Sequence, residues 1–182
     1  YTLATPIRLA QTYSIIANGG TAPAPYLIKQ LETWDGRVIE GPTRRLEHSA
    51  EIDPAVLELI RKALVSAVEG PDATGTLAQV EGVEVAGKTA TSQVVGLNFV
   101  KGLKPHEIPL GFRDHALFAA FAPAKEPEIV VVVIAEHAGS GGGTVAAPMA
   151  QKVLARFFEK KALSRGEVGL PGRDSESESG GE

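Results

Sequence analysis

The sequence predicts an α/β (α+β) sandwich, a mostly antiparallel sheet covered by helices on both of its faces. Three observations support this. Amphipathic helical patterns occur at the two ends of the chain and once between them. Two apolar strand patterns, 115–124 and 128–137, are joined only by Lys-Glu-Pro, a connection short enough to make them antiparallel neighbours. The second strand is apolar at consecutive positions, so both of its faces are expected to be covered.

The first element along the chain is a predicted helix over 5–17, and a hairpin follows it. Thr5 suits the N-cap, and the Asn-Gly-Gly run at 18–20 is a helix stop. Two strand-like runs flank the Asp-Gly pair at 35–36, which is typical of a hairpin. Trp34 beside that pair is a contact residue or, as is commoner for a strand aromatic, a packing residue.

The strongest helical pattern covers 53–70. Asp53 is positioned to cap it, and Pro54 suits its first turn. Its apolar residues recur at helical spacing and predict one apolar stripe, made of Val56, Leu57, Ile60, Leu64 and Val68.

The second half of the chain predicts three strands and a final helix. A strand over 83–96 precedes the two apolar strands, and a helix is expected over 143–163. From Ser164 the chain turns polar and ends in alternating Ser and Glu, so 164–182 is predicted to be a disordered tail. A phosphorylated docking segment is the alternative for this tail.

The amino-acid composition excludes several classes of function and of site. The 182 residues are 43% hydrophobic with a formal net charge of −4, which fits one globular core and no nucleic-acid partner. The longest apolar run, 129–135, is too short to span a membrane. The lack of cysteine excludes disulfides and thiolate metal sites. The chain opens on Tyr1 without a signal peptide, so we expect it to be an excerpt of a longer one.

Several familiar catalytic patterns do not occur. The glycine run at 137–148 lacks the Gly-Lys-Ser/Thr end of a phosphate loop and is interpreted as a flexible strand-to-helix turn. No Gly-x-Ser-x-Gly elbow occurs. The histidines have no metal-ligand spacing and are expected to be surface or supporting groups: His48, His106, His115 and His137. We expect no metal and no cofactor.

One lysine in the strand 83–96 is not explained by packing. Lys88 and Ala90 are expected on one face of this strand, with Thr89 and Thr91 on the other. An edge lysine that discourages strand-to-strand aggregation is one interpretation. The other is a ligand site, because Gly87 and Ala90 leave room for close approach and a cation beside two hydroxyls suits a carboxylate.

The segment GKTATSQVV, 87–95, resembles the Lys-Thr-Gly motif of penicillin-binding proteins and serine β-lactamases. Further blocks resemble class B transpeptidases in the same order: residues 1–21, 56–79 and 115–137. The final helix, GGGTVAAPMAQKVL at 141–154, resembles the elongation-specific branch, the penicillin-binding protein 2 type. The resemblance covers residues 1 to about 161.

The resemblance implies a penicillin-binding, serine β-lactamase-like fold and a D,D-transpeptidase activity. In this family a serine attacks the penultimate D-Ala carbonyl of a peptidoglycan stem peptide, expels the terminal D-Ala and passes the acyl group to an amine; β-lactams acylate the same serine. Lys88 would then supply positive potential and shuttle protons. Thr89 and Thr91 would bind the substrate carboxylate, and the Thr91 backbone N–H would be an oxyanion-hole donor.

Two departures qualify this expectation. Ala90 replaces the motif glycine, and its methyl is expected to tune or weaken the site, since overpacking costs about 1–3 kcal/mol. No Ser-x-x-Lys or Ser-x-Asn occurs in the sequence, and the family has both motifs upstream of the part that matches residue 1. Residues 1–163 are therefore expected to be the C-terminal portion of a transpeptidase domain, inactive alone.

The resemblance also implies the surroundings of the site. Expected partners are stem peptides, β-lactams, the remainder of the same domain and a membrane glycosyltransferase of the elongation machinery, at the periplasmic face of a bacterial inner membrane. Two alternatives stay open: a non-catalytic relative that binds stem peptides or cell-wall partners, and a serine β-lactamase or penicillin sensor. A large apolar surface is expected where the rest of the domain is missing.

Overall fold

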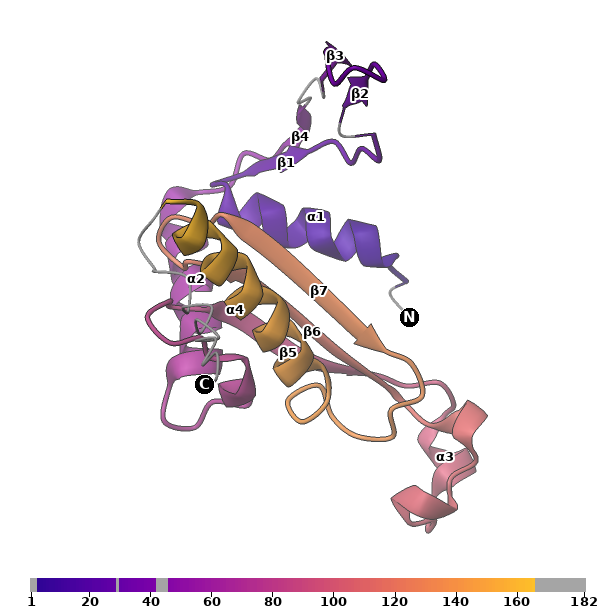
Figure 1. The fold of residues 1–182 in the computed structure, drawn as a ribbon. Coiled ribbons are helices and arrows are strands. Elements are labelled where there is room, and N and C mark those ends of the chain that lie inside the picture. The colour runs from indigo at the N-terminus through magenta and orange to yellow at the C-terminus, as the bar shows by residue number, and fades with distance from the viewer. Residues whose placement is uncertain (1–2, 29, 42–45, 166–182) are drawn as a thin grey trace, which may run out of the picture.

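The computed structural model describes residues 3–28, 30–41 and 46–165, with the chain path shown in Figure 1. The predicted tail falls outside the described residues from 166 onward. In chain order the helices and strands are α1 (Pro6–Ala17), β1 (Thr21–Pro23), β2 (Leu31–Glu32), β3 (Val38–Glu40), β4 (Leu46–Ser49), α2 (Pro54–Glu69), β5 (Ala86–Ser92), α3 (Leu97–Val100), β6 (His115–Ala122), β7 (Ile129–Ala135) and α4 (Ala146–Ser164). Short 3-10 turns lie at Thr76–Ala78, Pro105–Glu107 and Leu110–Phe112.

The main sheet is antiparallel and has the strand order β5-β6-β7. Lys88 pairs with Ala119 across β5 and β6, and Ala119 pairs in turn with Val132 of β7. The strands are shorter than their sequence patterns. Strand β6 ends at Ala122, before Pro123, because proline has no N–H to donate to a strand partner.

Helices cover both faces of this sheet, as predicted. Helix α4 packs on one face and forms a core with alternate residues of β6, including the fully buried Phe118 (Figure 1). Helices α1 and α2 pack on the other face, where Phe121 contacts a second cluster. The alternation follows from the period of two in a strand, which sends successive side chains of β6 to opposite layers.

The helix starts follow the predicted caps. The Thr5 hydroxyl accepts a 3.4 Å hydrogen bond from the Arg8 N–H, and the Asp53 carboxylate accepts one of 2.8 Å from Ala55 N–H. In the α2 stripe, Leu57 and Val68 are buried. Val56, the first residue of the stripe, is 46% exposed.

The predicted hairpin forms from β2 and β3, with Gly36 at φ 83° in its turn. Hydrogen bonds from Thr33 and Arg37 hold the pKa of Asp35 below its usual value. Strands β1 and β4 form a further two-stranded sheet that no pattern indicated. Trp34 is 99% exposed, so the packing interpretation of this residue was wrong. The hairpin projects away from the main sheet, and neither core cluster includes any of its residues (Figure 1).

Large apolar side chains are exposed at several places in the described part of the chain. They include Leu3, Ile7, Leu59, Leu97 and Phe99. In the described ranges, no helix has both the length and the apolar character required to cross a bilayer.

Candidate active site

The residues singled out in the sequence lie on β5, at an edge of the main sheet. Within the described part of the chain β6 is the only strand that pairs with β5, so the opposite edge of β5 carries no strand there. Every second backbone N–H and C=O of such an edge faces outward, available to an extended ligand.

Gly87 places this strand against the core. A Cβ at Gly87 would lie 2.7 Å from Cζ of Phe118 and 2.9 Å from Cβ of Ala120. The sequence had suggested that Gly87 lets another backbone or a ligand approach closely, and the approach seen here is that of the neighbouring strand β6 with its Phe118 side chain. Gly87 is buried and allows β5 to approach the α4-side core.

Lys88 and Thr89 form the cationic end of the site. Lys88 is exposed, and its Nζ donates hydrogen bonds to the Thr89 carbonyl (3.2 Å) and to the Thr89 hydroxyl (3.3 Å). Thr89 pairs with Phe118 and Thr91 with Ala116, two residues of the α4-side core, so both threonines lie on the α4 face. Ala90 pairs with Leu117 and is exposed on the opposite face, which Lys88 shares.

The glycine run between β7 and α4 packs directly over this strand. A Cβ at Gly142 would lie 2.1 Å from the Leu117 carbonyl oxygen and 2.7 Å from that of Ala90, and one at Gly143 would lie 2.3 Å from the Thr74 carbonyl oxygen. The run connects β7 to α4, as predicted, and at these two positions it packs closely against the backbone of other segments. Only glycine fits at these positions, because the backbone of the run lies against the backbone of β5, β6 and Thr74. Helix α4 begins at Ala146, later than the predicted start at Gly143.

A hydroxyl-rich groove of 570 Å³ opens between β5 and the glycine run. Its hydroxyl side chains come from three segments: Thr74, Thr89, Thr91, Ser140 and Thr144. The hydroxyls of Thr74 and Thr89 are 3.0 Å apart. The sequence did not indicate Thr74, Ser140 or Thr144, because each lies in a loop that reaches β5 only in the folded chain. The groove has the donors to hold a carboxylate beside the Lys88 ammonium.

Two of the histidines lie where β6 begins and just after β7 ends, and neither lines the groove. The His137 backbone N–H donates to Nδ1 of His115 (2.8 Å), and Nδ1 of His137 lies 3.2 Å from the Arg113 carbonyl oxygen. These contacts tie the end of β7 to the start of β6. His106 is exposed, and the side chain of His48 lies outside the described residues. Nowhere in the described ranges do three His, Asp or Glu side chains gather as metal ligands would.

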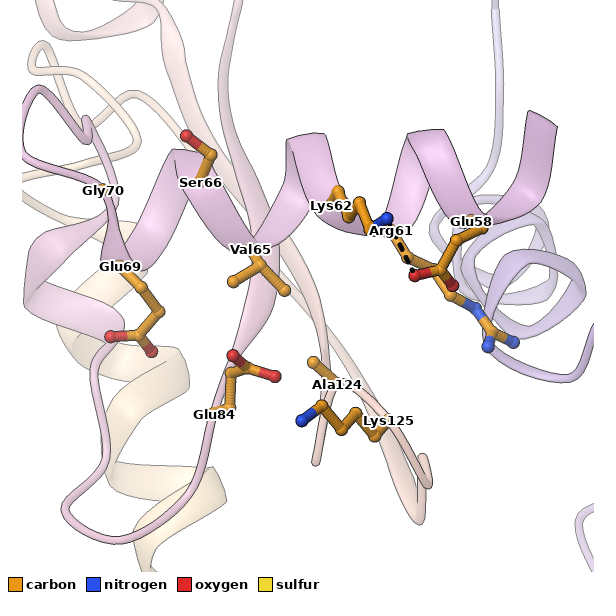
Figure 2. Close-up of a pocket in the computed structure, with 10 residues that line it drawn as sticks. All are labelled: Glu58, Arg61, Lys62, Val65, Ser66, Glu69, Gly70, Glu84, Ala124 and Lys125. Atoms are coloured by element: carbon orange, nitrogen blue, oxygen red, sulfur yellow. Dashed lines mark ion pairs between the residues drawn. The ribbon is translucent and has the colours of Figure 1, made fainter. Parts of the chain in front are cut away.

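A second pocket, of 540 Å³, lies between α2 and the residues next to the ends of β5 and β6 (Figure 2). It is lined by side chains of both charges, among them Glu69, Glu84 and Lys125. Two of its basic residues already have partners: Arg61 donates to the Ile16 and Ala17 carbonyls, and Lys62 pairs with Glu58 at 3.6 Å. It includes none of the residues of the β5 motif, so we place the candidate site at the groove instead.

Comparisons with known proteins converge on one family. The family model described as the penicillin binding protein transpeptidase domain matches residues 2–155. Among curated proteins, the peptidoglycan D,D-transpeptidase MrdA of Salmonella typhimurium is 34% identical over 163 residues, 89% of this chain and 26% of the relative. The D,D-transpeptidase PbpA of Mycolicibacterium smegmatis is 33% identical over 83% of this chain and 28% of the relative.

Solved structures agree with the sequence relatives. A D,D-transpeptidase domain from Eggerthella lenta has a TM-score of 0.69 at 25% identity, covering 88% of this chain and 33% of that one. Penicillin-binding protein A of M. tuberculosis, solved as a ceftriaxone acyl-enzyme complex, has a TM-score of 0.64 at 30% identity, covering 82% of this chain and 31% of that one. The chain spans about a quarter of the length of the curated relatives it matches.

Proposed function

Because this chain belongs to the penicillin-binding protein transpeptidase family, in its class B branch close to penicillin-binding protein 2, we propose that it forms one wall of the active site of a peptidoglycan D,D-transpeptidase. The observation that carries this proposal is the position of the Lys88–Thr91 segment. It lies on the free edge of β5, beside a groove lined with hydroxyl groups.

In this proposal three residues of the segment have a part in binding or catalysis. The Lys88 ammonium sets a positive potential at the edge and is placed to move protons to the leaving group. The hydroxyls of Thr89 and Thr91 bind the terminal carboxylate of a D-Ala-D-Ala stem peptide or of a β-lactam. The Thr91 backbone N–H serves as an oxyanion-hole donor, a contribution of about 3–4 kcal/mol to the transition state.

The nucleophile comes from outside these 182 residues in this proposal, since no serine in them is followed by lysine three positions later. The remainder of the domain packs on the exposed apolar side chains of α1, α2 and α3, such as Ile7, Leu59 and Phe99. The whole protein then works with a membrane glycosyltransferase, at the periplasmic face of a bacterial inner membrane.

The experiment that tests this function is intact-mass analysis after incubation with benzylpenicillin, on this chain and on the full-length protein that carries it. We expect one penicilloyl adduct on the full-length protein and none on the chain alone. No adduct on either would contradict a transpeptidase and favour a non-catalytic protein that binds stem peptides. Continuous turnover of penicillin would instead indicate a β-lactamase.

Ala90→Gly in the full-length protein is expected to raise the rate of acylation by benzylpenicillin about tenfold, because the Ala90 methyl lies on the exposed face shared with Lys88 and its removal relieves overpacking against a ligand. The same change is expected to lower the free energy of unfolding by about 0.5–1 kcal/mol, since glycine weakens a strand. Intact-mass analysis of samples quenched at set times measures the rate of acylation, and urea unfolding measures the free energy of unfolding. A rate that stays the same or falls would show that the methyl does not crowd the site.

A further inference from the structure

We propose that Thr74 is a positioning residue that fixes the direction in which the Thr89 hydroxyl donates its proton. This inference rests on the proposed function, because it concerns the threonine that would bind the substrate carboxylate. Thr74 lies outside the motif strand, in the loop after α2, and its Oγ1 is 3.0 Å from that of Thr89.

The proton inventory of the groove leads to this assignment. Each hydroxyl has one proton to donate and two lone pairs that accept. The Thr144 hydroxyl donates to the Gly141 carbonyl (3.1 Å), so the Ser140 hydroxyl, 2.8 Å from it, must be the donor in their mutual bond. Both protons of this pair are therefore committed within the glycine run, and neither is free for a ligand.

The pair formed by Thr74 and Thr89 is different. Neither of their hydroxyls donates to a carbonyl among the described residues, so the two hydroxyls hold two protons and use one between them. Thr89 already accepts from Nζ of Lys88 at 3.3 Å. A carboxylate only accepts, so Thr89 has to donate to it; Thr89 then fills its second lone pair by accepting from Thr74. The chain of donors runs from Thr74 to Thr89 to the ligand.

The backbone around Thr74 is held firmly enough for this task. The neighbouring Gly75 is buried, and its N–H donates to the Ala67 carbonyl at 3.0 Å, on the last turns of α2. A Cβ on Gly75 would lie 3.2 Å from the Phe118 ring, and Gly143 approaches the Thr74 carbonyl from the other side. Thr74 thus lies between the end of α2, the core and the glycine run, and it lines the groove.

The test uses the full-length protein and two ligands, benzylpenicillin and its methyl ester. Thr74→Val removes the hydroxyl and keeps the shape. It is expected to slow acylation by benzylpenicillin about fivefold, the effect of one hydrogen bond, and to slow acylation by the ester less, because the neutral ester is a weaker acceptor than the carboxylate. Thr74→Ser, which retains the hydroxyl, is expected to restore the rate to within about twofold. Thr12→Val, on an exposed turn of α1, is the matched control and is expected to change neither rate.

The outcomes separate the two proposals. If the unsubstituted protein is acylated but Thr74→Val reacts with benzylpenicillin at the unsubstituted rate, the role of Thr74 is overturned and the function stands. Equal slowing with both ligands would make Thr74 merely structural and would also overturn it. If the unsubstituted protein is not acylated at all, the proposed function fails and the role of Thr74 fails with it. Thr74→Ala provides the same comparison if the valine variant is unstable in a thermal melt.

Discussion

Replacing Lys88 with methionine in the full-length protein is expected to slow acylation by benzylpenicillin by about 100-fold or more, the effect of losing a proton-transfer group together with its charge. Its fold should not change, because the side chain is exposed and Nζ donates only to Thr89 among the described residues. Methionine keeps the length of the side chain. The measurement is the second-order rate constant of acylation, followed by intact mass, with a thermal melt to compare stability.

Lys62→Met is a suitable control for this variant. Lys62 is 73% exposed on α2, outside the groove, and its single ion pair is a surface pair, which contributes little to stability. We expect unchanged acylation for Lys62→Met. If Lys88→Met is also acylated at the normal rate, the alternative interpretation is correct, and Lys88 protects a free sheet edge. In that case the variant should aggregate more readily than the unsubstituted protein.

Gly142→Ala is expected to lower the free energy of unfolding by about 3 kcal/mol, at the upper end of the cost of overpacking. The added methyl would lie 2.1 Å from the Leu117 carbonyl oxygen and 3.0 Å from the Ala90 nitrogen, both backbone atoms that cannot rotate away. Either the glycine run lifts from the sheet or β5 shifts. Because Ala90 belongs to the candidate site, acylation of the full-length protein should fall as well.

Gly141→Ala is the matched control for Gly142→Ala, because it makes the same substitution in the same glycine run. A Cβ at Gly141 would meet nothing within 4 Å, and its φ is not positive, so we expect a change in stability within about 0.5 kcal/mol. Urea unfolding of the three proteins, together with their acylation rates, makes the comparison. Equal stability of the two variants would mean that the glycine run does not pack on β5 as described.

The larger elements of the fold could be predicted from local patterns. The predicted caps mark the starts of α1 and α2, since Thr5 and Asp53 accept hydrogen bonds from N–H groups of the first helical turns. The apolar run of β7 predicted cover on both faces, and α1 and α4 supply it. Strands β1 and β4 were missed. They are short, and each is stabilised by pairing with a partner far away in the sequence.

The candidate site was predictable only in part. The Lys88–Thr91 segment is unusual within its own strand, and its resemblance to a known motif supplied the rest. Thr74 and Ser140 had no such signal, because a threonine or serine in a loop is ordinary until the fold brings it to a strand edge. Gly87 and Gly142 were noticed, but the sequence could not name the atoms that they approach. Their surroundings are made by Phe118 and Leu117, which are remote in the sequence.

Local chemistry along the chain was therefore enough to establish the α/β sandwich, the order of its larger elements and the Lys-Thr segment of the family. Hydrophobic period, capping and motif spacing are properties of neighbouring residues. The shape of the groove depends on tertiary contacts. Which face each threonine occupies depends on the register between β5 and β6, and the close approach of Gly142 and Gly143 depends on how α4 packs on the sheet. Those are contacts between distant segments, and no short stretch of sequence contains them.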